Sequence, residues 1–199
     1  MEKAQVGRPR AFDAEAALEK AMVVFWAEGY EGASLTDLTE AMGISRKSMY
    51  AAFGNKEQLF RKALQRYTEG PASYGAEALQ APTARAVAMA FLTGAVRANT
   101  RPGRPAGCLG VQGGLAAGES GRVARDTLVE WRAMGQAQLR ERFRRAVEEG
   151  DLPAGADPEL IARYLMTLAH GLAVQAASGA ACEDLQRVAD AALRNWPPS

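Results

Sequence analysis

Residues 41–53, "AMGISRKSMYAAF", place two serines, an arginine, a lysine and a tyrosine between apolar residues. Ser45 is a plausible N-cap for a helix that begins at Arg46 and ends near Phe53. Gly43 can adopt the positive φ that a tight turn before this helix requires. A short helix with one polar face is either an ordinary solvated surface helix or a helix that lies against an anionic partner. The neighbouring residues must decide between the two.

The residues just before this stretch predict a second short helix. In "GASLTDLTEAMG", residues 32–43, Ser34 is the expected N-cap, and Asp37 three residues later completes a capping box. Gly43 ends this helix, and only a few residues separate it from the next. Ile44, Met49 and Phe53 supply apolar contacts between the two. Two short helices joined by a turn containing glycine predict a helix-turn-helix.

Apolar residues recur at helical spacing along the rest of the chain, and sustained alternation is lacking. Asp13 is the expected N-cap of the first helix and Gly29 its stop, while Asn55 and Gln58 form a capping box before residues 56–67. Further helices are expected at residues 83–99, 121–149, 159–178 and 182–196. We therefore predict an all-α protein with an N-terminal arm and helix-turn-helix domain at 1–60 and a larger helical domain at 61–199.

Composition limits the class of protein. The net charge of +1 gives no overall basic field, so nucleic-acid binding must depend on a local patch. Two distant cysteines and no apolar signal segment fit the reducing cytoplasm. Residues 164–182 carry no charge, but their polarity favours a helix buried at a protein interface over a membrane span. We expect no membrane association and a cytoplasmic location.

The exposed face of the second short helix carries the residue types that bind DNA. Arginine and lysine can donate to guanine in the major groove, where the N-terminal end of such a helix enters, and serine can pair with either partner. Backbone amides near Thr36 and the side chain of Lys56 can hold phosphates, and a basic arm can reach phosphate or the minor groove. The predicted DNA-binding residues are Arg8, Arg10, Thr36, Ser45, Arg46, Lys47, Ser48, Tyr50 and Lys56.

From "GRPRAFD" through "ALEKAMVVFWAEGYEGASLTDLTEAMGISRKSMYAAFGNKEQLF", the sequence resembles the TetR family of bacterial transcriptional repressors. The resemblance covers roughly a third of the chain. It implies a homodimer in which each subunit presents the helix that begins at Arg46 to one half of a near-palindromic double-stranded DNA operator. Two positions depart from the common pattern: Met49 stands where leucine is usual, and Ala52 replaces a larger residue, so one phosphate contact is expected to be missing.

The resemblance also implies that the C-terminal part holds a pocket for a small-molecule effector, whose identity the sequence does not give. An apolar set with a few polar groups suits such a site, although each member is also a candidate for the ordinary core. The predicted ligand-binding residues are Tyr67, Phe91, Cys108, Val111, Trp131, Met134, Gln138, Tyr164, Leu168 and His170.

The last two long helices, 159–178 and 182–196, match the pair that typically forms a four-helix bundle between two family members. Small residues such as Gly171 and Ala173 would let helices approach closely, and an exposed apolar face of this size would otherwise aggregate. Packing of the same helices within a monomer is the alternative. A two-fold DNA site favours the dimer.

Cys108 begins a short helix, where a thiolate can be favoured, so a repressor that senses electrophiles or oxidants is a second hypothesis. A small buried hydrophobe is the ordinary alternative. A helical-bundle enzyme finds no set of catalytic partners in a sequence with one histidine, and no metal-ligand cluster or phosphate-binding glycine motif is recognisable. We therefore expect no catalytic residues, no metal and no cofactor. A purely structural helical dimer would leave Arg46 and Lys47 unexplained.

Overall fold

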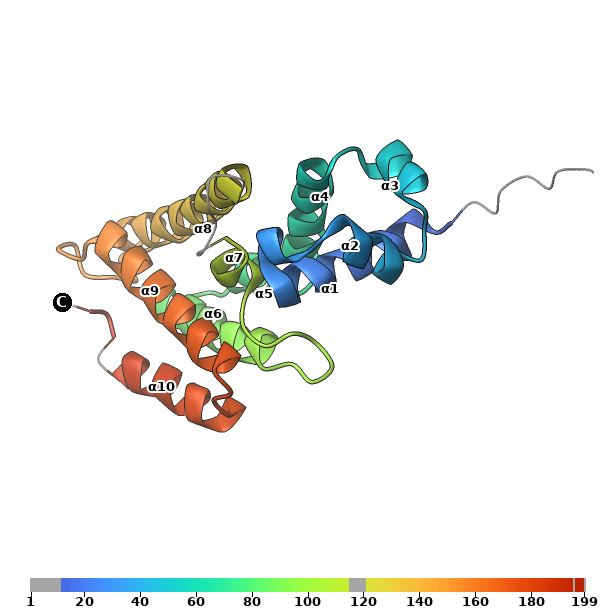
Figure 1. The fold of residues 1–199 in the computed structure, drawn as a ribbon. Helices are drawn as coiled ribbons and strands as arrows, with labels where there is room; N and C mark the ends of the chain where they lie inside the picture. Colours follow the sequence, from blue (N-terminus) through green and yellow to red (C-terminus); the bar gives the residue numbers. More distant parts are fainter. Residues whose placement is uncertain (1–11, 115–120, 195, 199) are drawn as a thin grey trace, which may run out of the picture.

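The structure is a computed structural model that describes residues 12–114, 121–194 and 196–198. These residues form ten helices and no strand, so the predicted all-α fold is confirmed (Figure 1). In chain order the helices are α1 (Ala14–Gly32), α2 (Leu35–Met42), α3 (Arg46–Phe53), α4 (Lys56–Glu69), α5 (Tyr74–Ala78), α6 (Ala84–Asn99), α7 (Leu109–Gln112), α8 (Arg122–Glu148), α9 (Pro158–Ala177) and α10 (Cys182–Arg194).

The capping residues read from the sequence are confirmed. The Ser34 hydroxyl accepts a hydrogen bond from the Asp37 amide at 3.1 Å, and the Asp37 carboxylate accepts one from the Ser34 amide at 3.0 Å. Asn55 and Gln58 form the same reciprocal pair at the start of α4. Gly43 takes the left-handed conformation, with φ 70°, in the turn between α2 and α3. Local side-chain chemistry therefore sets the limits of the helix-turn-helix.

Two expected helix ends differ from the structure. Gly29 adopts a non-helical conformation with φ 72°, but helical residues resume beyond it and α1 ends at Gly32, so Gly29 kinks the helix rather than ending it. The short helix expected to begin at Cys108 is observed at Leu109–Gln112, and residues 115–120 lie outside the described residues.

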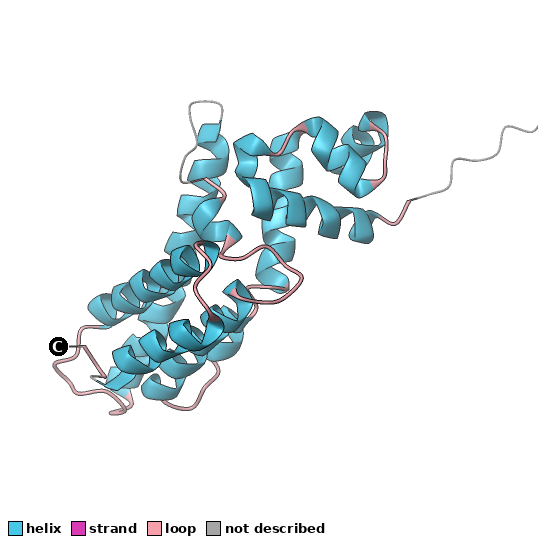
Figure 2. Ribbon diagram, turned by 60° about the horizontal axis from the view of Figure 1, so that its bottom comes forward, coloured by secondary structure: helices cyan, strands magenta, loops and turns pink. Residues whose placement is uncertain are grey.

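Buried side chains form two core clusters. The first lies among α1–α4 and includes Phe25, Leu38, Met49, Phe60 and Tyr67, all fully buried. The second joins α6, α8, α9 and α10, which run alongside one another in the C-terminal half (Figure 2). The division of the chain into 1–60 and 61–199 stays a prediction, but the first cluster continues through α4 as far as Tyr67.

The short helix α7 connects the two halves. Cys108, Leu109 and Val111 belong to the first core cluster, together with Leu128 of α8. The loop before α7 accepts a hydrogen bond from the Trp26 indole at the Gly107 carbonyl, 3.0 Å away. The Tyr30 amide donates to the carbonyl of Gly113 at 3.1 Å. The C-terminal half is therefore bonded directly to the helix that supports the helix-turn-helix.

Among the described residues, no helix is both long enough and apolar enough to cross a bilayer.

Candidate nucleic-acid interface and ligand cavity

Helix α3 is anchored by one face and exposed on the other. Met49 and Phe53 are buried against the first core cluster, and Ile44 packs beside them half-buried. Ser45 caps the helix, because its hydroxyl accepts a hydrogen bond from the Ser48 amide at 3.1 Å. Tyr50 is 49% exposed. The division of this helix into a packing face and a free face, expected from the sequence, is therefore present in the fold.

The free face collects most of the predicted DNA-binding residues. Ser45, Arg46 and Lys47 are exposed in the first turn of α3, and Ser48 is half-buried. The Arg46 guanidinium donates to the hydroxyl of Thr36 on α2, with 2.8 Å between Nη2 and Oγ1. Both side chains are exposed, and such a bond contributes little to stability. Arg46 can therefore exchange Thr36 for a base or a phosphate. The bond between Arg46 and Thr36 was not predicted from the sequence.

Lys56 lies at the start of α4, beside the α2–α3 pair. Its ammonium nitrogen is 4.6 Å from the centre of the Tyr30 ring, a cation–π contact. Partial burial lowers the pKa of Lys56, while the nearby carboxylates of Glu31 and Asp37 act in the opposite direction. The side chain is thus held at the edge of the helix-turn-helix. Arg8 and Arg10, the predicted arm residues, lie outside the described residues.

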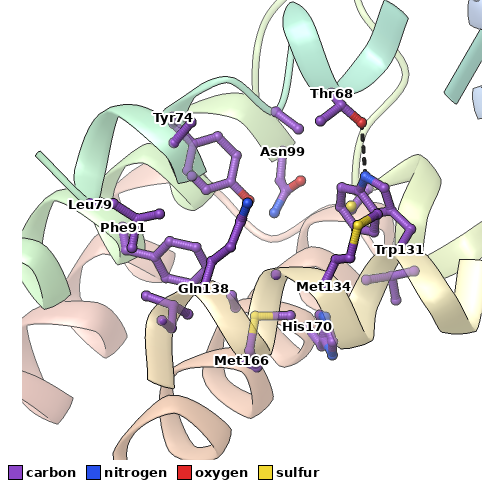
Figure 3. A pocket seen from close by; sticks show the side chains of 18 residues that line it. Thr68, Tyr74, Leu79, Phe91, Asn99, Trp131, Met134, Gln138, Met166 and His170 are labelled. Atoms are coloured by element: carbon purple, nitrogen blue, oxygen red, sulfur yellow. Dashed lines mark hydrogen bonds between the residues drawn. The ribbon is translucent and has the colours of Figure 1, made fainter. Parts of the chain in front are cut away.

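A cavity of about 200 Å³ lies in the C-terminal half, between α4–α5, α6, α7, α8 and α9 (Figure 3). Its wall includes seven of the ten residues predicted to bind a ligand: Phe91, Cys108, Val111, Trp131, Met134, Gln138 and His170. Met134 is 61% exposed and Gln138 is also exposed, whereas Phe91 and Cys108 are buried. The cavity is therefore a partly enclosed space with Met134 and Gln138 at its mouth.

Three predicted ligand-binding residues do not line this cavity. Tyr67 is fully buried in the first core cluster, one residue before Thr68, which does line it. Tyr164 and Leu168 lie on α9 but are offset by two residues from the cavity-lining Met166 and His170. A step of two residues turns a side chain to nearly the opposite side of a helix. Both pack half-buried against the second core cluster.

Sequence reasoning also missed wall residues. Thr68, Tyr74 and Asn99 contribute polar groups to the cavity from α4, α5 and α6. Asn99 is only 1% exposed, and its Oδ1 is buried without a hydrogen-bond partner. Asn99 is the last residue of an apolar helix, where a buried amide is unusual. An asparagine at the end of an apolar helix was therefore the signal in the sequence that could have identified Asn99 as a wall residue.

The titratable groups on the cavity wall are uncharged at neutral pH. Burial raises the pKa of the Cys108 thiol, although the hydrogen bond donated by the Tyr67 hydroxyl at 3.3 Å favours the thiolate. Burial also raises the pKa of the Tyr74 hydroxyl. Burial lowers the pKa of His170 below its usual value, and the charge of Arg132 adds to this effect. Within the described ranges, no three His, Cys, Asp or Glu side chains are grouped so as to hold a metal ion.

Trp131 links the cavity wall to the DNA-binding half. Its indole nitrogen donates to the Thr68 hydroxyl of α4 at 2.8 Å (Figure 3). Its ring also lies against the backbone of α7, because a Cβ atom at Gly110 would fall 2.1 Å from the ring carbon Cζ3. No residue larger than glycine fits at this approach. Trp131 therefore contacts both α4 and α7.

The outer sides of α9 and α10 carry exposed apolar side chains. Leu160 and Val174 on α9 are exposed, Val174 to 46%, and Val188 on α10 is exposed to 50%. Gly171 lies between them along α9 and is exposed too. Helix α10 packs against α6 and α9 at the edge of the C-terminal half (Figure 1).

A capped helix-turn-helix with an exposed basic helix, joined to a helical domain that encloses a cavity, defines a ligand-binding type of DNA-binding regulator. Family models match both parts: the bacterial regulatory proteins of the tetR family at residues 17–63, and the tetracyclin repressor-like C-terminal domain at residues 82–192. The chain therefore belongs to the TetR family of transcriptional regulators, which are DNA-binding proteins and not enzymes.

Individual relatives agree with this assignment. The chain is 35% identical to the HTH-type transcriptional repressor ComR of Escherichia coli K12 over 96% of its own length and 92% of that protein. A TetR family regulator named CifR, in a cysteine-substituted form complexed with 26-base-pair operator DNA, is 44% identical with a TM-score of 0.91, and the match covers 96% of this chain and 100% of that one. A TetR regulator from Rhodococcus sp. RHA1 is also 44% identical, with a TM-score of 0.64 over 94% and 100% of the two chains.

Proposed function

We propose that this regulator is a homodimeric repressor that leaves a near-palindromic operator when a small molecule fills the cavity behind Trp131. The observation that carries the proposal is the hydrogen bond between Trp131 of the cavity wall and Thr68 of α4. Helix α4 begins at Lys56, next to the reading helix α3, and ends at the cavity. One rigid element therefore touches both sites.

The reading face is assigned to α3. Arg46 and Lys47 project from its first turn, where the positive end of the helix dipole favours anions. Ser45, Ser48 and Tyr50 lie on the same short helix, and Thr36 and Lys56 flank it. The operator complex of the CifR relative supports this assignment by similarity of fold. Arg8 and Arg10 are proposed to reach the adjacent groove or backbone.

The dimer is assigned to α9 and α10. Their exposed apolar side, with Val174 and Val188, is a surface that a second copy of the chain would cover. A two-fold dimer places two copies of α3 on the same face of the DNA, one helical turn apart. Because its partner is DNA in a bacterial cell, we infer that the protein acts in the cytoplasm.

The coupling requires two conformations that differ in DNA affinity, because a ligand shifts an equilibrium only by its differential affinity for the two states. Filling the cavity changes the position of Trp131, and through Thr68 and Gly110 this displaces α4 and α7. The bonds from α7 and its preceding loop to Trp26 and Tyr30 carry the same displacement to α1. The spacing of the two α3 helices then no longer fits the operator.

Footprinting on the protein's own promoter region tests the DNA part of the proposal. Two protected half-sites about one helical turn apart are expected. The affinity should also fall steeply with salt, because phosphate contacts on both half-sites release counterions. A single protected half-site, or an affinity insensitive to salt, would contradict the dimeric reading.

A second candidate function is thiol-based sensing by Cys108. The supporting observation is that its sulfur lies on the cavity wall, so an electrophile that enters the cavity meets it. Its raised pKa keeps the resting thiol protonated, which slows attack. If sensing operates, Cys108→Ser abolishes release of the operator by an electrophile, whereas Cys182→Ser leaves it intact. Unchanged release in Cys108→Ser removes this candidate.

A further inference from the structure

The polar groups of the cavity indicate what kind of molecule it takes. This inference rests on the proposed function, because it assumes that the cavity behind Trp131 is the effector site. Its wall is mostly apolar, and no lysine, arginine, aspartate or glutamate is among the described residues that line it. A charged ligand would lose its hydration without gaining an ionic partner. The cavity therefore disfavours anions and cations.

Several polar atoms on or beside the wall already have partners within the protein. The Thr68 hydroxyl accepts from the Trp131 indole, and the Cys108 sulfur accepts from the Tyr67 hydroxyl. The nearby Arg132 is not on the wall, and its guanidinium donates to the Gly110 carbonyl at 2.5 Å. These groups position the wall, while the Tyr74 hydroxyl, the His170 ring and the Gln138 amide also border the cavity.

Asn99 differs from these groups because it is both deeply buried and without a partner at its Oδ1. Its side chain projects from the end of α6 into the space between Tyr74 and Trp131 (Figure 3). Its Oδ1 is buried and accepts no hydrogen bond, although the residue is 99% removed from solvent. A buried acceptor without a donor is costly, and native proteins rarely leave one without a purpose. The Asn99 side chain borders a mostly apolar cavity, and its Oδ1 has no donor.

The size of the cavity sets a limit on the ligand. An apolar cavity of roughly 150 Å³ holds benzene, and this one measures about 200 Å³. One aromatic ring with a short substituent fits this space. The exposed side chains of Met134, Gln138 and Thr68 lie where the cavity opens to solvent.

We propose that the cavity takes an uncharged, largely apolar molecule of roughly eight to ten non-hydrogen atoms that carries a hydrogen-bond donor for Oδ1 of Asn99. The donor occupies the inner end of the cavity, and the apolar body lies between Phe91 and Trp131. Asn99 is thus the residue that selects alcohols, phenols or amides over hydrocarbons and ethers of the same shape.

Four probes of similar size test this on the full-length protein by titration calorimetry. Benzyl alcohol has a donor, anisole has only an acceptor, ethylbenzene has neither, and benzoate is an anion. Benzyl alcohol is expected to bind about tenfold more tightly than anisole or ethylbenzene, and benzoate more weakly than all three. Equal affinities of the three neutral probes, tightest binding of benzoate, or no binding of any probe would overturn the proposal.

Two variants test whether Asn99 causes the preference for benzyl alcohol. Asn99→Leu keeps the shape and removes the acceptor, so benzyl alcohol is expected to lose its advantage while ethylbenzene binds as before. Met89→Ala, on the exposed side of the same helix, should leave all affinities unchanged. A preference that survives in Asn99→Leu contradicts the assignment. Thermal unfolding checks that Asn99→Leu folds; if it does not, the ranking of probes on the natural protein alone decides.

Operator release is measured separately, by fluorescence anisotropy of labelled promoter DNA. Selective binding of benzyl alcohol without release supports the ligand class and contradicts the proposed coupling. Release by all neutral probes without preference for the alcohol supports the coupling and overturns the ligand class. The two proposals therefore fail in different experiments.

Discussion

The two halves of this molecule are specified by different kinds of information. In the DNA-binding half, the start of each helix depends on residues within three or four positions, as in the reciprocal bonds of Ser34 with Asp37. In the C-terminal half, the cavity is assembled from side chains of α4 to α9 that are far apart in sequence. The first half presents a fixed surface to a partner common to the whole family. The second half encloses a space whose occupant can differ from member to member.

The largest effect is expected at the reading helix. Arg46→Ala combined with Lys47→Ala should weaken specific operator binding at least about 100-fold, because each base contact contributes roughly 1–3 kcal/mol and the dimer loses each contact twice. Anisotropy titration with promoter DNA measures this. The control is Arg85→Ala combined with Arg101→Ala, which removes the same charge from exposed positions at the two ends of α6. Unchanged specific binding in the first variant would show that α3 is not the reading helix.

The next effect concerns the dimer. Val174→Asp places a charge on the exposed apolar side of α9, and two-fold symmetry buries it twice, so dimer dissociation should increase about 100-fold. Sedimentation velocity gives the ratio of monomer to dimer. Val129→Asp, at a similarly exposed position on α8, is the matched control. If both variants remain dimeric, the interface lies elsewhere.

The contact between α7 and Trp131 should give a smaller effect. Gly110→Ala forces a methyl group into the Trp131 ring and is expected to lower the free energy of unfolding by about 1–3 kcal/mol. Chemical denaturation measures the loss, and tryptophan fluorescence reports the displaced ring. Gly155→Ala, where an added Cβ meets nothing within 4 Å, should cost far less. Equal losses in the two variants would remove Gly110 and Trp131 from the coupling route.

The smallest effect tests whether capping side chains set the helix boundaries of the DNA-binding half. Ser34→Ala removes the capping box of α2 and should cost about 1 kcal/mol of stability. Ser73→Ala changes a serine at the start of α5 whose side chain makes no capping bond, so its cost should be close to zero. Thermal unfolding compares the two variants. A larger loss in Ser73→Ala would contradict the view that caps define the boundaries of the DNA-binding half.

The contrast between local and tertiary determinants explains which features could be predicted from the sequence. The fold class, the caps at Ser34, Ser45 and Asn55, and the exposed side of α3 follow from spacing and local chemistry. The α8 contribution to the cavity was also predictable, because Trp131, Met134 and Gln138 recur at helical spacing. Asn99 and Thr68 were missed because their role depends on tertiary contacts. Residues 164–182 carry no charge, so the sequence did not show which side of α9 faces the cavity. Tyr164 and Leu168 were therefore grouped with His170, although only His170 lines the cavity.

The central claim is that the cavity controls the separation of the two α3 helices. It is tested most directly by the distance between spin labels at Ala52→Cys, on exposed α3, in a Cys182→Ser background, measured by pulsed electron resonance with promoter DNA. One narrow distance near about 35 Å is expected on the operator, matching successive major grooves. Saturation with benzyl alcohol should produce a second, different distance. An unchanged distance while calorimetry shows the cavity occupied would contradict the account.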